Sequence, residues 1–265
     1  ALKVSIHKAC DGSMGALHLS LNPALALNGD LQRNLANELY GKKVLVGGLE
    51  GLSRFIESSE DTFALQLFGN GAGVIGVIPG ETMQFLAGKT LEVFDEQGVL
   101  AVRMYYPHIG RDKGDSNVDV QLVSNQHIRL AGLMHEPANG APIAMAGPMG
   151  MVKLFVRNGV QVVREVHQAY RAQMEAQGRP ERQIKVAVVH HANYKINKLK
   201  QKQLQDEGIS LDMPWVLSDF GNVSAASCII AYLRLLPQFQ PGDHILFDGF
   251  GAGTYYDVLA VELGS

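Results

Sequence analysis

Cysteine is scarce in this sequence, with two residues among 265. So small a number excludes a disulfide scaffold and is typical of a reducing compartment, so we expect a cytoplasmic location. Apolar runs long enough to cross a membrane are absent, as is a signal-peptide pattern. Neither sign of charge dominates, because 26 acidic residues face 23 basic ones and the net charge is −3. Such a balance does not indicate a nucleic-acid partner.

Apolar residues, by contrast, are plentiful, and at 46% of the chain they suffice for a large core. Hydrophobic periodicity predicts the order strand, helix, helix and three strands in the first half. The second half predicts helix, strand, helix, helix, strand, strand. Two similar α/β halves are the fold that this order favours.

The clearest predicted helix runs from Val152 to Met174, where apolar side chains recur every three or four residues. A hairpin is predicted over Leu91–Tyr106. Predicted buried strands include 43–48, 63–68, 74–78, 184–189, 245–250 and 256–263. The glycine-rich run Gly69–Gly73 separates two of these strands, and no helix or Lys-Ser/Thr pair follows it. We therefore interpret it as a place of tight turning or close backbone approach rather than as a phosphate cradle.

The chain is organised around the stretch from Lys8 to Leu17. A strand-like run over 2–7 leads into it, and a helix-like run from Gly12 leads out towards Leu21. Cys10 therefore lies at a predicted helix start, where backbone N–H groups and the helix dipole stabilise a thiolate. This stretch alone leaves open whether Cys10 is an acyl-accepting nucleophile or a buried structural thiol.

Asp11, directly after Cys10, is an unusual neighbour for a nucleophile. A carboxylate at this position raises the pKa of the thiol by like-charge repulsion, unless it points away and caps the helix.

Other polar residues follow predicted strands or precede predicted helices. His190 and His191 end the strand at 184–189, and a lysine-rich helix comes next. We interpret that helix as presenting a solvated basic face, with Lys195, Lys198, Lys200 and Lys202. Asn222 lies in a loop before another helix, for which Ser224 is the predicted N-cap. His167 and Cys228 are interpreted as core residues of their helices.

Three motifs, taken in order, resemble the β-ketoacyl-acyl-carrier-protein synthase III family. They are Ala9-Cys10 opening a helix, His190-x-Ala192-Asn193 closing a strand, and Gly221-Asn222-x-Ser224-Ala225-Ala226-Ser227 opening a helix. Supporting matches are Phe68-Gly69-Asn70-Gly71-Ala72-Gly73 and Phe250-Gly251-Ala252-Gly253. The family has the thiolase fold, so the resemblance implies two α/β halves with mixed sheets between helices.

The resemblance also implies a division of the chain. The remainder of the half that carries the nucleophile is expected at 1–147, and the half that carries His and Asn at 148–265. Family members have a substantial segment before the cysteine, whereas nine residues precede Cys10 here. We therefore expect the first half to be incomplete and the sequence to be a fragment or one piece of a split protein.

The chemistry implied by the resemblance uses Cys10, His190 and Asn222 as catalytic residues. Cys10 accepts an acyl group from a thioester, and His190 and Asn222 stabilise the enolate left when a malonyl thioester decarboxylates. Attack of the enolate on acyl-Cys10 completes a Claisen condensation. The expected oxyanion hole is formed by backbone N–H groups of Cys10 and of the Gly251-Ala252 loop. His191 would be the catalytic candidate in place of His190 only if the match to the family motif were shifted by one residue.

The resemblance further places Asn193 and Lys195 near a phosphopantetheine arm. Acyl-CoA or acyl-carrier-protein thioesters are the implied substrates, and neither a separate cofactor nor a metal is expected. A homodimer is the expected assembly, and an N-terminal fragment of the same protein or a second subunit is a further candidate partner.

Two alternatives stay open from the sequence. An acyltransferase on the same scaffold passes the acyl group from Cys10 to an alcohol, an amine or another acceptor. A non-catalytic partner subunit of a split synthase needs no nucleophile, and the retained Cys10, His190 and Asn222 argue against it.

Overall fold

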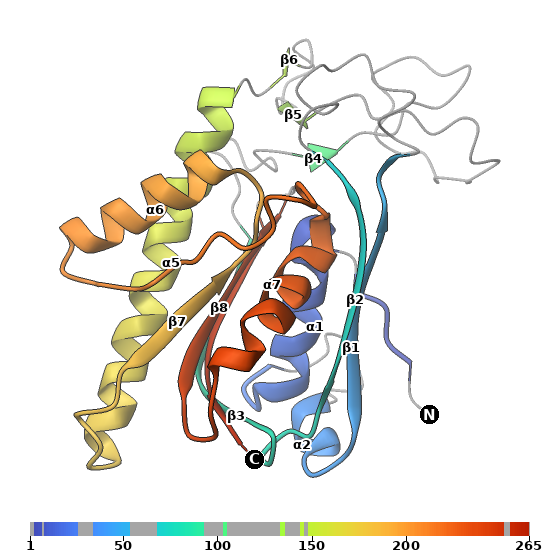
Figure 1. The fold of residues 1–265 in the computed structure, drawn as a ribbon. Helices are drawn as coiled ribbons and strands as arrows, with labels where there is room; N and C mark the ends of the chain where they lie inside the picture. The colour runs from blue at the N-terminus through green and yellow to red at the C-terminus, as the bar shows by residue number, and fades with distance from the viewer. Residues whose placement is uncertain are drawn as a thin grey trace.

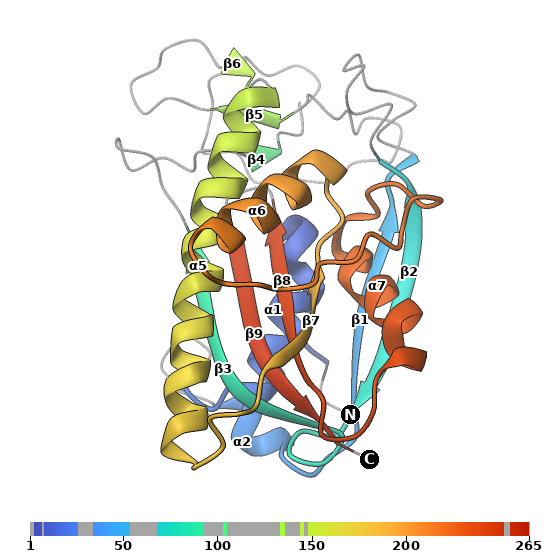
Figure 2. The same cartoon turned by 60° about the vertical axis from the view of Figure 1, so that its left-hand side comes forward.

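The elements form four layers, helix, sheet, helix, sheet, in the computed structural model (Figures 1 and 2). Helices α5 and α6 cover the outer face of a four-stranded sheet, and α1 and α7 lie between that sheet and a two-stranded one. The structure describes residues 3–6, 8–25, 34–53, 68–92, 103–104, 133–135, 144–145, 148–251 and 255–264, with side chains from 155 onward in α5.

The four-stranded sheet has the order β3-β9-β8-β7. Its strands are β3 (Met83–Glu92), β7 (Ile184–Val189), β8 (His244–Gly251) and β9 (Tyr255–Leu263). β7 and β8 are parallel, whereas β9 is antiparallel to both of its neighbours. Every residue of β8 is buried, because helices cover both faces of the sheet. The predicted α/β class with a mixed sheet between helices is confirmed.

Helices pack on both faces of this sheet. The outer face carries α5 (Pro148–Ala176) and α6 (Tyr194–Asp206), and the inner face carries α1 (Gly12–Leu21) and α7 (Ser227–Leu235). The short helices α2 (Leu35–Leu39) and η4 (Leu236–Gln238) follow α1 and α7. One apolar cluster fills each side of the sheet. Within the described part of the chain, no helix has both the length and the apolar character needed to span a membrane.

The second sheet pairs β1 (Val44–Gly51) with β2 (Asn70–Val77) in antiparallel register. Its inner face is buried against α1 and α7, whereas Leu45, Leu49 and Val74 on the outer face are 80%, 75% and 51% exposed. The strand predicted at 43–48 therefore exists but is buried on one face only. No described element covers the other face.

Gly71 and Gly73 of the Gly69–Gly73 run lie within β2 rather than in a turn, and they let α7 and the segment before it approach the strand. A Cβ atom on Gly71 would lie 2.9 Å from Cβ of Val223, and one on Gly73 would lie 2.8 Å from Cγ2 of Ile229. Neither distance is possible for a real side chain, so the predicted close backbone approach is confirmed.

Three predicted elements differ from the structure or lie outside it. Residues 3–6 are not in a strand, because no described strand pairs with their backbone groups. β3 begins earlier than the predicted hairpin and pairs with β9, so a strand from before residue 147 joins the sheet of the second half. The predicted turn of that hairpin and the strand residues 63–67 lie outside the described residues. The division of the chain at residue 147 stays a prediction.

Three very short strands form a separate sheet in the order β4-β5-β6. They are β4 (Arg103–Met104), β5 (Leu133–His135) and β6 (Ala144–Met145).

Candidate active site

Cys10 lies in a 3-10 turn, η1 (Ala9–Asp11), that leads directly into α1. Ala9 has φ = 48°, a left-handed conformation that is rare for a residue with a Cβ atom. The Asp11 N–H donates to Lys8 O at 3.0 Å and closes the turn. The position predicted for Cys10 at a helix start is confirmed, and its side chain is partly exposed.

The other cysteine, Cys228, lies in the first turn of α7 and is buried. Burial raises the pKa of its thiol well above the usual value, with the charges of Asp248 and Asp11 adding to the effect. Its predicted place in the core is confirmed.

The end of β8 lies against the Cys10 turn. A Cβ atom on Gly251 would lie 2.9 Å from Cys10 N and 2.8 Å from Lys8 O. Only glycine permits this approach, which brings the backbone of Gly251 next to the backbone N–H of the nucleophile. Ala252, the other residue predicted for the oxyanion hole, lies outside the described residues, so that hole stays a prediction.

His190 follows the last residue of β7, and its N–H donates to Asp248 O at 2.9 Å. The ring is buried edge-on against Phe250, 5.0 Å between centroids, and its Nδ1 has no hydrogen-bond partner among the described residues. Burial, followed by the charges of His191 and Lys200, lowers the pKa of His190 to about 3. The imidazole is therefore neutral at pH 7.

His191 has both ring nitrogens engaged. Its Nδ1 donates to Val189 O at 2.7 Å, and its Nε2 accepts from the Val216 N–H at 3.0 Å. Trp215 packs on the ring, 4.4 Å between centroids. These contacts make His191 a structural residue and leave His190 as the histidine with free hydrogen-bonding capacity.

Asn222 lies two residues before the start of the second 3-10 turn, η3 (Ser224–Ala226). Its Oδ1 accepts from the Ser224 N–H at 2.9 Å, which orients the amide and leaves Nδ2 as the donor. The predicted capping role of Ser224 is wrong, because η3 intervenes and Ala226 occupies the N-cap position of α7. Like Ala9, Ser224 has φ = 48°.

The segments that carry these residues meet. Ser13 Oγ, in the first turn of α1, donates to Ala225 O in η3. The turn η1 also packs against η3 and β8. His190 lies against Phe250, the residue before Gly251, so the segments that carry the three predicted catalytic residues lie near the same end of β8. Their action as one site stays a prediction.

Asn193 and Lys195 are placed at the start of α6. The Asn193 Oδ1 accepts from the Lys195 N–H at 2.9 Å, so this side chain is the N-cap of the helix. The side chain of Lys195 is exposed. Their contact with a phosphopantetheine arm stays a prediction.

Lys200 and Asp248 were not predicted as part of the site. Lys200 Nζ lies 2.7 and 2.5 Å from the two carboxylate oxygens of Asp248, and both side chains are completely buried. The interpretation of Lys200 as part of a solvated face is therefore wrong. The spacing Ile196, Lys200, Leu204 carried the signal, since it places the lysine on the apolar face of α6.

Asp11 does not cap α1, and its carboxyl points into the protein instead. Burial raises its pKa well above the usual value, and the nearby charge of Asp257 adds to the effect. It is therefore not the carboxylate that the sequence placed beside the thiol.

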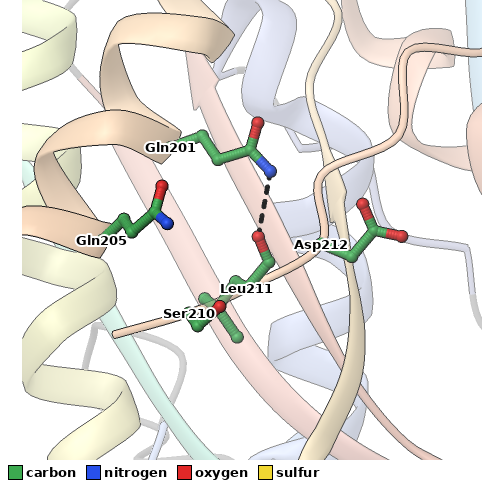
Figure 3. A pocket seen from close by; sticks show the side chains of 5 residues that line it. All are labelled: Gln201, Gln205, Ser210, Leu211 and Asp212. Carbon is green, nitrogen blue, oxygen red and sulfur yellow. Dashed lines mark hydrogen bonds between the residues drawn. The ribbon is translucent and has the colours of Figure 1, made fainter. Parts of the chain in front are cut away.

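A hollow of about 280 Å³ lies between α6 and the segment after it, lined by Gln201, Gln205, Ser210, Leu211 and Asp212 (Figure 3). Gln201 Nε2 donates to Leu211 O across it at 3.1 Å. Its lining is polar and contains none of the predicted catalytic residues, so it does not suit an acyl chain.

Comparison with known proteins finds similar sequences. The family model of the 3-oxoacyl-[acyl-carrier-protein (ACP)] synthase III C terminal matches residues 174–263. A β-ketoacyl-[acyl-carrier-protein] synthase III of Mycobacteroides abscessus is 30% identical over 249 residues, which are 91% of this chain and 61% of the relative. The chain is therefore similar to β-ketoacyl-acyl-carrier-protein synthase III over most of its length, and its residues 174–263 match the C-terminal part of that family. It spans less than two thirds of this relative's length.

Solved synthase III structures have the same fold as this chain. The 3-oxoacyl-[acyl-carrier-protein] synthase III of Aquifex aeolicus superposes with a TM-score of 0.60 at 24% identity, over 96% of this chain and 65% of that one. The priming β-ketosynthase of the R1128 polyketide pathway gives 0.61 at 23% identity, over 97% and 64%. The thiolase-like fold that the sequence predicts is confirmed.

Proposed function

We propose that this chain carries the condensing site of a β-ketoacyl synthase III-like enzyme, with Cys10, His190 and Asn222 as its catalytic residues. The observation that carries the proposal is the packing of the segments that hold them: the Cys10 turn packs against the turn after Asn222 and against β8, whose Phe250 contacts the neutral ring of His190. A cysteine at a helix start, a neutral histidine and an oriented amide donor are the groups that acyl transfer and enolate formation need.

The first step is acylation of Cys10. Its thiolate attacks the carbonyl carbon of an acyl thioester, and the thiol of CoA or of an acyl carrier protein leaves. The helix start stabilises the thiolate through backbone N–H groups and the dipole of α1. The backbone of Gly251 lies beside the Cys10 N–H, where both can face the oxyanion that forms.

The second step is decarboxylation of a malonyl thioester. Loss of carbon dioxide leaves an enolate, and two neutral donors stabilise its oxygen. Nδ1 of His190 is buried without a partner, which favours the tautomer with the proton on Nε2. Nδ2 of Asn222 is the second donor, because its Oδ1 is already bonded to the Ser224 N–H.

The third step joins the two acyl units. The enolate carbon attacks the carbonyl of acyl-Cys10, a carbon–carbon bond forms, and the Cys10 thiolate leaves. The product is a β-ketoacyl thioester. Neutral His190 and Asn222 stabilise the enolate without a formal charge, so they do not quench the carbanion by donating a strongly acidic proton.

Transfer of the acyl group to an alcohol or amine is the second candidate on this scaffold. It needs the Cys10 turn but gives no task to a pair of neutral donors. The arrangement of His190 and Asn222 therefore favours condensation.

Acyl-CoA and acyl carrier protein are the partners that fit this chemistry, in a cytoplasmic setting and without a further cofactor. The outer face of the β1–β2 sheet is suited to contact another polypeptide segment, because Leu45, Leu49 and Val74 make it apolar and exposed. We assign that face to the homodimer or to a second polypeptide that completes the synthase.

Intact-mass measurement tests the proposal. Incubation with an acyl-CoA or acyl carrier protein is expected to add one acyl mass, which Cys10→Ala abolishes and the control Cys228→Ala does not. Malonyl thioester is then expected to release carbon dioxide and yield a β-ketoacyl product. An unmodified protein would rule out both candidates, and an adduct transferred only to an alcohol or amine would favour the acyltransferase.

A further inference from the structure

Four ionisable side chains lie beneath the Cys10 turn and have no task in the proposed chemistry. They are Lys8, Asp11, His18 and Asp257. Asp11, His18 and Asp257 are almost completely buried, with at most 1% exposure. They come from the turn itself, from α1 and from β9, so the cluster ties the nucleophile's turn to the four-stranded sheet.

Asp257 has a donor on each carboxylate oxygen. Lys8 Nζ lies 2.5 Å from Oδ2, and His18 Nδ1 lies 2.8 Å from Oδ1. Nδ2 of Asn22 donates to His18 Nε2 at 3.0 Å, so the proton of the neutral ring is on Nδ1 and is given to Asp257. Although burial opposes it, these partners lower the pKa of Asp257, which is therefore the ionised member of the cluster.

Asp11 is different, because within the described part of the chain no N–H or O–H donor reaches its carboxyl oxygens. Its Oδ1 rests on β8, where a Cβ atom on Gly249 would lie 2.1 Å from it. Its remaining polar neighbour is the carboxylate of Asp257. Two carboxyl groups in contact need a proton between them, and Lys8 already balances the charge of Asp257.

We propose that Asp11 is a positioning residue for the nucleophile: as a neutral acid it donates a hydrogen bond to Asp257 and holds the Cys10 turn against β8 and β9. The turn needs such an anchor, because Ala9 has φ = 48° and the Gly251 backbone is in contact with Cys10 N. Displacement of the turn would move Cys10 N–H away from Gly251 and from the oxyanion that the two are proposed to bind.

The proposed role of the Asp11 proton also predicts that the reactivity of Cys10 falls at alkaline pH, where this proton is lost. Its loss would place a second negative charge beside Asp257, with Asp248 of β8 and the Cys10 thiolate nearby. Lys8 is the cation that acts on Asp11, and Lys200 is paired with Asp248. Burial raises the pKa of Asp11 well above its usual value, so the neutral form persists where ordinary carboxyls are ionised.

The role of Asp11 in catalysis rests on the proposed function. Two measurements distinguish a failure of that role from a failure of the proposed function. One is the rate of Cys10 acylation by acyl-CoA. The other is the rate of Cys10 alkylation by iodoacetamide, which needs a correctly placed thiolate but no acyl chemistry. Cys228 is buried and does not compete.

Asp11→Asn is the matched variant, because an amide keeps the shape and the donor but does not ionise. We expect it to retain at least one third of the wild-type rates at neutral pH and to lose the decline at alkaline pH. Asp11→Ala removes the donor and is expected to lower both rates tenfold or more. Equal losses in both variants would overturn the neutral-donor assignment, and an unaffected Asp11→Ala would overturn the positioning role.

Infrared spectroscopy of the wild-type protein keeps the inference testable if Asp11→Ala does not fold. A protonated-carboxyl band is expected at neutral pH, and Asp11→Asn should remove it. The absence of that band in the wild type would overturn the inference. If alkylation follows the expected pattern but no acyl adduct forms in any variant, the proposed function fails while the role of Asp11 stands.

Discussion

The Cys10 turn and the Asn222 turn have the same backbone but present different chemistry. Each is a three-residue 3-10 turn that opens an α-helix, Ala9–Asp11 before α1 and Ser224–Ala226 before α7. Each begins with a residue at φ = 48°, and these are the only non-glycine residues with positive φ among those the structure describes. The same strained backbone turn therefore occurs twice, and the residues on the two turns have different proposed roles in catalysis.

The residues at the second position of the two turns account for the division. Cys10 has the thiol, whereas the equivalent Ala225 has no reactive group and its N–H donates to Glu50 Oε1 at 3.2 Å. The second N–H of the first turn lies beside Gly251 and is proposed to bind an oxyanion, whereas the equivalent N–H of the second turn binds a carboxylate. The functional group of the second turn is instead Asn222, which precedes it.

Exchanging the residues at this position is the strongest test of the comparison. Cys10→Ala is expected to lower acylation by at least about 1,000-fold, because the nucleophile is lost. Adding Ala225→Cys to that variant should not restore it, since Glu50 occupies the space beside the 225 N–H. Intact mass after incubation with acyl-CoA measures both, and an adduct on residue 225 would show that the two turns are functionally interchangeable.

Changing Asn222 tests the other turn. Asn222→Asp keeps the acceptor for the Ser224 N–H but replaces the donor Nδ2 with an anionic oxygen. We expect condensation with malonyl thioester to fall roughly 100- to 1,000-fold, the usual cost of one lost oxyanion donor. Acylation of Cys10 should stay within about threefold of the wild type, because Asn222 has no part in that step. Parallel losses in both steps would contradict the division of labour.

The sequence predicts the positions of Cys10, His190 and Asn222 better than the buried ionisable residues near them. The reason is that the contacts of those buried residues join segments far apart in the chain. Cys10, His190 and Asn222 each follow or precede a helix or strand whose pattern is local. Lys200 was assigned to solvent because its partner Asp248 lies on a distant strand that no local pattern connects to α6. Asp11 was judged as a carboxylate because its partner Asp257 lies at the other end of the chain.

The missed strand has a comparable explanation. β3 has a bulge between Phe85 and Ala87 where it pairs with β9, so its side chains do not alternate along the whole strand. The sequence also does not reveal the exposure of the β1–β2 face, because glycine and apolar residues make up most of that face and the polar Asn70 lies at its end. Both cases depend on pairing and coverage, which a single sequence does not contain.

Substitution of Lys200 tests whether the buried Lys200–Asp248 ion pair near His190 stabilises the fold. Lys200→Met leaves Asp248 buried without its cation and is expected to lower the free energy of unfolding by about 3–5 kcal/mol. Lys198→Met, on the exposed face of the same helix, should change it by less than about 0.5 kcal/mol. Urea denaturation of the two variants measures the difference, and equal effects would mean that the ion pair does not stabilise this side.

The pH dependence of stability is expected to differ in sign between the two sides of the site. His190 has a folded-state pKa of about 3 against a usual 6.5, so its contribution is present above pH 6.5 and is lost as the pH falls towards 3. Asp11 has a pKa raised above the usual 3.8, so its contribution is present below that value and is lost as the pH rises. Each slope is at most about 1.4 kcal/mol per pH unit. Urea titrations should show a flatter acid limb in His190→Gln and a flatter alkaline limb in Asp11→Asn; a variant that flattens the opposite limb would contradict the assigned protonation states.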